Sequence, residues 1–180
     1  MRDQIKNYNF HPERSITHSM KKTFIVLSVT LFIALTAKGQ KLFFIGENSY
    51  TCTEAFTLKS NSDDGNDLNV LFAKDGAEAL FAVSTKSIEL TIFSGKLIIY
   101  LDDGSVITCN DNGKSERVDD ASKAAYSLAN EQLNKMRNSN INTVRYTLQF
   151  AGMRETNYSA SNKGRSTKTD FPALITEFYE

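Results

Sequence analysis

The side chain best placed for catalysis in this sequence is the carboxylate of Glu54. It stands in the run 50–58, where alternation puts it on the same face as Tyr50, Cys52 and Phe56. A carboxyl group buried among such side chains has a raised pKa and can act as a general acid or base. With a loop aspartate about 5–9.5 Å away, it could hydrolyse a glycan. Two structural alternatives are an edge strand, where an inward charge blocks aggregation, and a bulge that turns Glu54 outward.

A second group of carboxylates, Asp63, Asp64 and Asp67, lies in the loop SNSDDGND at 60–67. Ca²⁺ prefers oxygen ligands supplied by loops, so these side chains could hold a cation. The loop lacks the spacing and the distant glutamate of an EF-hand, and Asp and Asn also favour turns for backbone reasons alone. We therefore predict no metal site, with a weak cation site at the three aspartates as the alternative.

Cys52 and Cys109 are the two cysteines of the chain. In an oxidising compartment such a pair favours a disulfide, and closing a loop of this length would stabilise the fold by roughly 4 kcal/mol. The alternative is two buried, reduced cysteines that act as small apolar side chains. The sequence leaves both open, because it does not show whether the two Cα atoms lie close enough to bridge.

Residues 20–39, MKKTFIVLSVTLFIALTAKG, have the three-part layout of a Sec signal peptide. Lys21 and Lys22 form a cationic head, and 23–37 is an uncharged, largely apolar run that ends at small residues around Gly39. This run is shorter than the roughly 18–20 residues that span a bilayer, so a retained anchor is the less favoured alternative. We expect cleavage before Gln40.

Export would also define the domains of the chain. Residues 1–19 are polar and lack apolar periodicity, so we expect them to be an upstream extension ahead of the true start at Met20. Residues 40–180 then form one globular domain in the periplasm or at the surface of a bacterial cell. We expect no lipid anchor, because no Cys directly follows the apolar run.

The composition of residues 40–180 argues against several function classes. Both histidines, His11 and His18, lie before residue 40, and catalytic triads and most zinc sites need His. The chain has 21 basic and 21 acidic residues; six and two of these precede residue 40, which leaves 15 and 19, a net charge of −4. This charge does not favour nucleic acid or an anionic membrane as partner. We predict no catalytic residues and no cofactor.

Short alternating runs and Gly-containing turns predict an α+β domain dominated by an antiparallel β-meander of about 7–8 strands. The clearest strand is 141–150, whose apolar face packs inward while the opposite face, with Arg145, lies in water. The other expected strands are 41–45, 50–58, two runs within 68–83, 88–92, 97–101 and 106–109, and 123–128 is a further candidate. The expected turns are Asp75-Gly76, Ser94-Gly95 and Asp103-Gly104.

Two helices should accompany this sheet. Ala129, Leu133 and Met136 fall at i, i+4 and i+7 and predict a short internal helix with Ser127 as its N-cap. A C-terminal helix capped by Asp170 should pack on the sheet. The segment 151–169, rich in Ser, Asn, Thr, Gly and Lys, is expected to be a flexible loop.

The segments KLIIYLDDGSVIT at 96–108 and YSLANEQLNKMRNSNINTVRYTL at 126–148 describe a Gly-turned hairpin, a short helix and a strand. In this pattern the chain resembles small bacterial secreted or periplasmic proteins of unknown function that carry signal peptides. The resemblance implies no activity. We predict a non-enzymatic domain that binds a protein or glycan partner through its loops or a sheet face. A glycan hydrolase using Glu54 and a loop aspartate is the alternative.

Overall fold

The computed structural model describes residues 41–63, 65–86, 89–150, 154–163 and 168–179. These residues belong to one compact unit and form eleven strands and two helices. The elements are β1 (Lys41–Ile45), β2 (Asn48–Cys52), β3 (Phe56–Ser60), β4 (Leu68–Asp75), β5 (Glu78–Lys86), β6 (Thr91–Leu101), β7 (Val106–Cys109), β8 (Ser115–Val118), β9 (Ala121–Leu128), α2 (Asn130–Asn138), β10 (Ile141–Phe150), β11 (Arg154–Ser161) and α3 (Phe171–Tyr179). The predicted α+β class is confirmed.

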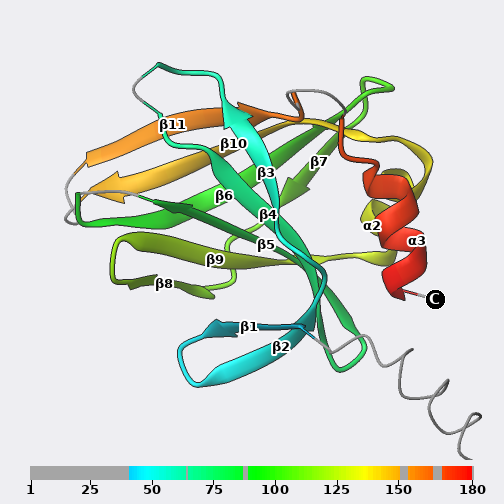
Figure 1. Ribbon diagram of the computed structural model, residues 1–180, viewed down its shortest axis with the longest axis horizontal. Coiled ribbons are helices and arrows are strands. Elements are labelled where there is room, and N and C mark those ends of the chain that lie inside the picture. Colours follow the sequence, from blue (N-terminus) through cyan, green and yellow to red (C-terminus); the bar gives the residue numbers. More distant parts are fainter. Residues whose placement is uncertain (1–40, 64, 87–88, 151–153, 164–167, 180) are drawn as a thin grey trace, which may run out of the picture. The chain divides into compact units, whose positions relative to one another are not determined.

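The described strands join one antiparallel sheet (Figure 1). Its main path runs β7-β6-β10-β11-β3-β4-β5-β9-β8, and the β1–β2 hairpin attaches through β2 to β4. The sheet is not a simple meander, because β10 and β11 enter between β6 and β3. The predicted strand count is wrong for two reasons. The run 50–58 breaks at Thr53, whose N–H and hydroxyl bond to the main chain of Phe72, and β8 and β11 lie where loops were expected.

The sheet curves so that strands from its two ends meet. Thr91 of β6 and Ser122 of β9 are buried, and their hydroxyl oxygens lie 2.9 Å apart although the two strands are not neighbours on the sheet path. The inner face encloses the main core, in which Phe72 packs edge-on against Phe81 and Phe171 with ring centroids 5.4 and 6.1 Å apart. This closure removes the largest apolar side chains from water.

The central β4–β5 hairpin is buried on both faces. Phe72 and Phe81 point into the main core, whereas Leu71 and Leu80 point the other way and pack with Tyr50 of the β1–β2 hairpin. A strand covered on both sides has an almost continuous apolar sequence, as both of these strands do. The hairpin therefore forms the wall between the main core and a smaller cluster under β1 and β2.

Two of the three predicted turns are confirmed. Gly76, with φ 58°, lies in the turn between β4 and β5, and Gly104, with φ 84°, lies in the turn between β6 and β7. Ser94 and Gly95 do not form the third turn, because β6 continues through them. The pairing of β6 with β10 shifts register between Ser94 and Ile98, which is a β-bulge, and Gly95 takes φ 67° there.

The internal helix α2 buries Leu133 and Met136, as its periodicity predicts. Its N-cap is Ala129 rather than Ser127, because Ser127 still belongs to β9. The N–H of Ala129 bonds instead to Oε1 of Gln132 at 2.8 Å. This bond is one half of a capping box, and the other half is missing because Ala129 has no side-chain oxygen to accept an N–H of the first turn.

The C-terminal helix α3 packs on the sheet, as predicted. Phe171 is buried against Phe56 and Phe72, and the carboxylate of Asp170 accepts the N–H of Ala173 at 3.2 Å. Asp170 is thus the predicted cap. Neither α2 nor α3 has the length and apolar character needed to cross a bilayer, and the described residues hold no other candidate.

The prediction of a flexible loop at 151–169 is wrong for the central part of this segment. Residues Arg154–Ser161 form β11, which pairs with β10 along its whole length. Tyr158 stacks on Tyr146 of β10 with ring centroids 5.8 Å apart, while Asn157 on the opposite face is exposed. The polar outer face of this strand gives the segment its loop-like composition. Residues 151–153 and 164–167 lie outside the described residues.

Candidate functional site: a polar cleft beside β11

The structure does not bury Glu54. The residue lies between β2 and β3, its side chain is 70% exposed, and it forms an ion pair with Lys41. The hydrogen bond from Lys41, reinforced by its charge, lowers the pKa of Glu54. This is the opposite of the raised pKa predicted for a catalytic acid. The prediction is wrong because the strand breaks at Thr53, so the alternation that placed Glu54 inward does not continue through it.

The loop aspartates do not assemble a cation site in the described part of the chain. Asp67 forms an ion pair with Lys59 and accepts the N–H of Ser60 at 3.0 Å, so its carboxylate is already neutralised. Asp63 is exposed, and Asp64 lies outside the described residues. The described residues contain no group of three or more His, Cys, Asp or Glu side chains suited to a metal ion.

The two cysteines are free and buried, so of the two alternatives that the sequence left open the structure favours two reduced thiols over a disulfide. Cys109 belongs to the main core and Cys52 to the smaller cluster on the other face of the β4–β5 hairpin. The wall of strands between them explains why they do not bridge. Burial raises the pKa of Cys109 to about 12 and also raises that of Cys52, which makes both poor nucleophiles at neutral pH.

A polar cleft of about 380 Å³ lies between β11 and the segment that follows β3. One wall is the outer face of β10 and β11, and the other is the start of the 61–67 loop. Arg145 is the one charged residue that lines the cleft and Tyr158 the one aromatic residue; the others have small, uncharged polar side chains. The full lining is Asn61, Ser62, Arg145, Thr156, Asn157, Tyr158 and Ser159.

The cleft opens because β11 separates from β3. The two strands pair only at Ala160 with Ser60 and at Ser161 with Lys59, and one further main-chain bond joins the Asn61 N–H to the Ser159 carbonyl at 2.9 Å. After Asn61 the chain turns away from β11. The rest of β11 therefore has a strand partner on its β10 side alone among the described strands.

Hydrogen bonds fix the walls of the cleft. The Asn61 amide donates to the hydroxyls of Ser159 at 3.1 Å and Ser161 at 2.8 Å. Thr147 of β10 donates to the carbonyl oxygen of the Asn157 side chain at 2.9 Å, which leaves the Asn157 amide group as a donor toward the cleft. In the described part of the chain, the Arg145 guanidinium has no ion-pair or hydrogen-bond partner. An exposed, unpaired guanidinium at the edge of a polar cleft is suited to a carboxylate or another oxyanion.

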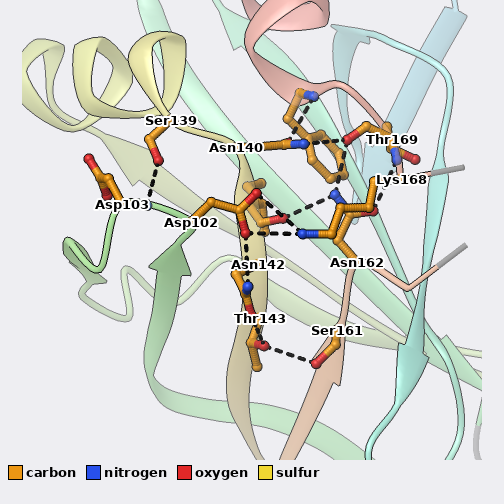
Figure 2. Close-up of polar contacts among 12 residues, drawn as sticks. Asp102, Asp103, Ser139, Asn140, Asn142, Thr143, Ser161, Asn162, Lys168 and Thr169 are labelled. Atoms are coloured by element: carbon orange, nitrogen blue, oxygen red, sulfur yellow. Dashed lines mark hydrogen bonds and ion pairs between the residues drawn. The ribbon is translucent and has the colours of Figure 1, made fainter.

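The polar contacts continue from this cleft to the start of α3 (Figure 2). Ser161 contacts Thr143 at 2.9 Å, Thr143 donates to Asn142 at 2.8 Å, and Asn142 donates to Asp102 at 2.8 Å. Lys168 then bonds to the same Asp102 carboxylate at 3.2 Å. Because every one of these side chains already has partners, we assign this chain of contacts a structural role.

Asp102 shows the electrostatic effect of those contacts. The hydrogen bond from Asn142 is the main cause that lowers the pKa of Asp102; partial desolvation opposes it, and Lys168 adds to the lowering. Nearby, the buried Asn162 amide donates to the carbonyls of Ile141 and Thr169, both at 3.0 Å. These bonds hold the end of β11 and the segment before α3 against the start of β10.

Exposed apolar side chains lie on the same outer face, on the strands beyond β10. Tyr100 of β6 and Val106 of β7, which are cross-strand partners, are 36% and 47% exposed, and Ile92, near the other end of β6, is 40% exposed. Ile98 of β6, which is half-buried, pairs with Arg145 and lies between Tyr100 and the exposed Lys96. The outer face therefore offers apolar contact area and the cations of Arg145 and Lys96 next to hydrogen-bonding groups.

Sequence reasoning placed Arg145 on the wet face of its strand but missed the cleft. Asn61, Asn157 and Ser159 fell in segments expected to be loops. A signal for β11 was present, because Thr156, Tyr158 and Ala160 alternate with polar residues directly after a clear strand. Comparison of the chain with family models, curated proteins and solved structures found no match.

Proposed function

We propose that this protein is a non-enzymatic binding domain whose ligand or partner occupies the polar cleft and the adjoining outer face of the sheet. The observation that carries the proposal is the guanidinium of Arg145, which has no partner among the residues that the structure describes and lines a cleft of otherwise uncharged hydrogen-bonding side chains. Such a cation favours an anionic ligand, since the neutral groups around it do not compensate its charge.

The chemistry of the cleft favours binding over catalysis. The residues that line it include Arg145 and Tyr158 but no carboxylate, imidazole or thiol that could serve as a general acid, a general base or an activated nucleophile. Glu54, the acid of the alternative hydrolase, is exposed with a lowered pKa, whereas a general acid needs a raised one. The exposed pair of Tyr100 and Val106 on the same face supports a partner large enough to cover this pair as well as the cleft.

Differential capture tests this function. Wild-type protein, Arg145→Ala and the control Lys135→Ala are immobilised and exposed to an envelope extract of the producing cells. Lys135 carries the same charge but lies on α2, paired with Glu131 at 3.0 Å and outside the cleft. We expect one or more species retained by wild type and by Lys135→Ala to be lost with Arg145→Ala. Identical retention by all three proteins would contradict the proposal.

We further propose that the domain works after export, in the periplasm or at the cell surface, following removal of residues 1–39. The sequence pattern of 20–39 supports this proposal. Mass spectrometry of protein purified from envelope and culture fractions should give a mature chain that begins at Gln40. Recovery of exported protein that still contains His11 or His18 would refute it.

A further inference from the structure

We infer that the cleft accepts an extended acidic peptide, which adds a strand to the unpaired edge of β11 and places a carboxylate on Arg145. This inference deepens the binding function proposed above and rests on it. Three features of the described residues carry it: the free edge of β11, the unpaired charge of Arg145, and the way Tyr158 is already packed.

The free edge of β11 follows from its hydrogen-bond pattern. The main-chain carbonyl of Ser159 points away from β10, because it accepts the N–H of Asn61 at 2.9 Å. Main-chain groups in an antiparallel strand alternate between its two sides, so those of Asn157 and Glu155 point to the same side as Ser159. No described strand pairs with β11 there, since the pairing with β3 begins only at Ala160.

An incoming extended peptide satisfies these groups directly. Unpaired main-chain N–H and C=O groups at a sheet edge bind an added strand, and the main-chain bonds supply affinity that does not depend on sequence. The turn after β3 keeps the chain itself away from this edge, because the Gly65 N–H bonds to the Ser62 carbonyl at 3.1 Å. The cleft beside Asn157 and Ser159 is therefore open to another chain.

Arg145 supplies the selectivity. It pairs across strands with Ser159, and both side chains line the cleft. The nearest acidic residue along β11, Glu155, is engaged by the hydroxyl of Ser94, which donates to it at 3.0 Å. The hydroxyl does not neutralise the Glu155 carboxylate, but Glu155 does not line the cleft, and Arg145 is the one charged residue among those that do. A peptide carboxylate can form a charge-assisted, bidentate bond with the guanidinium, which an uncharged side chain cannot.

The aromatic side chain of the cleft favours a peptide over a sugar. Tyr158 is half-buried and stacks on Tyr146 with centroids 5.8 Å apart and an interplanar angle of 25°. One face of its ring is therefore covered within the protein, and a second aromatic platform is not among the residues that line the cleft. Glycan sites commonly use such platforms, whereas strand addition depends on main-chain groups.

The test uses peptides whose residues alternate between Thr and Val, with Glu, Gln or Lys at the centre. Binding to the full folded domain is measured by fluorescence anisotropy. We expect the Glu peptides to bind and the Gln and Lys peptides to bind about ten- to a hundredfold more weakly, the range for losing a charged hydrogen-bond partner. Arg145→Ala should remove the preference for Glu, while Lys135→Ala should retain it.

The strand-addition geometry has its own matched pair of variants. Asn157→Pro removes a main-chain N–H that points to the free edge, so it breaks no bond to β10, and proline is tolerated at sheet edges. Asn157→Ala loses the same side chain but keeps the N–H. Both variants lose the Asn157 amide donor, so the difference between them reports the main-chain N–H alone, and we expect Asn157→Pro to bind the peptide at least about tenfold more weakly than Asn157→Ala. If circular dichroism shows that Asn157→Pro is unfolded, main-chain N-methylation of the peptide makes the same test from the other side.

The outcomes separate this inference from the proposed function. Equal binding of Glu and Gln peptides, or no peptide binding, overturns the inference. If an oligomer of galacturonic acid binds in an Arg145-dependent manner while the peptides do not, the inference fails and the binding function stands. If neither probe binds and the capture experiment shows no dependence on Arg145, both fail.

Discussion

Tyr179 donates its phenolic hydrogen to the main-chain carbonyl of Ala73 at 2.8 Å and lies 3.3 Å from the carbonyl oxygen of Leu80. The bond ties the last turn of α3 to the central β4–β5 hairpin, about a hundred residues earlier in the chain. Burial, which outweighs the hydrogen bonds to Leu80 and Ala73, raises the pKa of Tyr179. The hydroxyl therefore stays protonated and acts as a permanent donor at neutral pH.

Removing this hydroxyl should destabilise the fold. Tyr179→Phe leaves the carbonyl of Ala73 without its donor from α3, which costs about 1–2 kcal/mol of the free energy of unfolding. Equilibrium urea unfolding measures the loss as a lower midpoint at unchanged slope. The control is Tyr100→Phe, whose ring is 36% exposed and should change stability by less than about 0.5 kcal/mol. Equal midpoints for the two variants would show that the bond to Ala73 does not fasten α3.

Asp102 should make stability depend on pH in the acid range. Its pKa in the folded state lies below the ordinary value of about 3.9. The contribution is therefore complete above that value and is lost as the pH falls through the lower folded pKa. Because the side chain is 36% exposed, we expect Asp102→Asn to cost only about 0.5 kcal/mol at pH 7.

Urea unfolding of this variant at several pH values makes the measurement. The difference from wild type should shrink between pH 4 and pH 2, roughly the range over which such a carboxylate protonates. Asp63→Asn, in an exposed loop, is the control and should match wild type throughout. A difference between wild type and Asp102→Asn that grows as the pH falls would contradict the assigned sign.

The thiols should be unreactive in the folded protein. Cys52 and Cys109 are buried with raised pKa values, that of Cys109 to about 12, so little thiolate exists at pH 8. We expect negligible labelling by Ellman's reagent in the native state. In denaturant without reductant, both cysteines of the chain should react. A shortfall after denaturation would reveal a disulfide, and rapid labelling of native protein would show that the thiols are accessible.

The sequence predicted the parts of this fold that depend on neighbouring residues. The alternation in β10 correctly places Val144 inward and Arg145 outward, because side-chain direction in a strand is local. The cleft could not be predicted in this way. It depends on where β11 separates from β3, and the bond between Asn61 and Ser159 joins residues almost a hundred positions apart. The prediction that Glu54 is buried failed for a related reason, because the bonds of Thr53 to Phe72 of β4 end the strand just before Glu54.

The pair Ser94-Gly95 shows that one local sequence pattern is compatible with two structures, a turn and a β-bulge within a strand. Ser-Gly between apolar runs is typical of a turn, but here Gly95 takes its φ of 67° inside β6, and its N–H bonds to the carboxylate of Asp111 at 3.1 Å. A Cβ at this position would meet no atom within 4 Å, so a substitution is penalised by backbone conformation and not by crowding. We therefore expect Gly95→Ala to lower the free energy of unfolding by about 1–2 kcal/mol.

Two further variants separate this conformational cost from other effects. Gly95→Asn should lose less stability than Gly95→Ala, because Asn tolerates the left-handed region better. Lys96→Ala, at the exposed next position, should be within about 0.5 kcal/mol of wild type. If Gly95→Ala is as stable as wild type in urea unfolding, the backbone at Gly95 does not have the left-handed conformation. The assignment of a β-bulge at Gly95 would then be wrong, and the continuation of β6 through Ser94 would have to be revised.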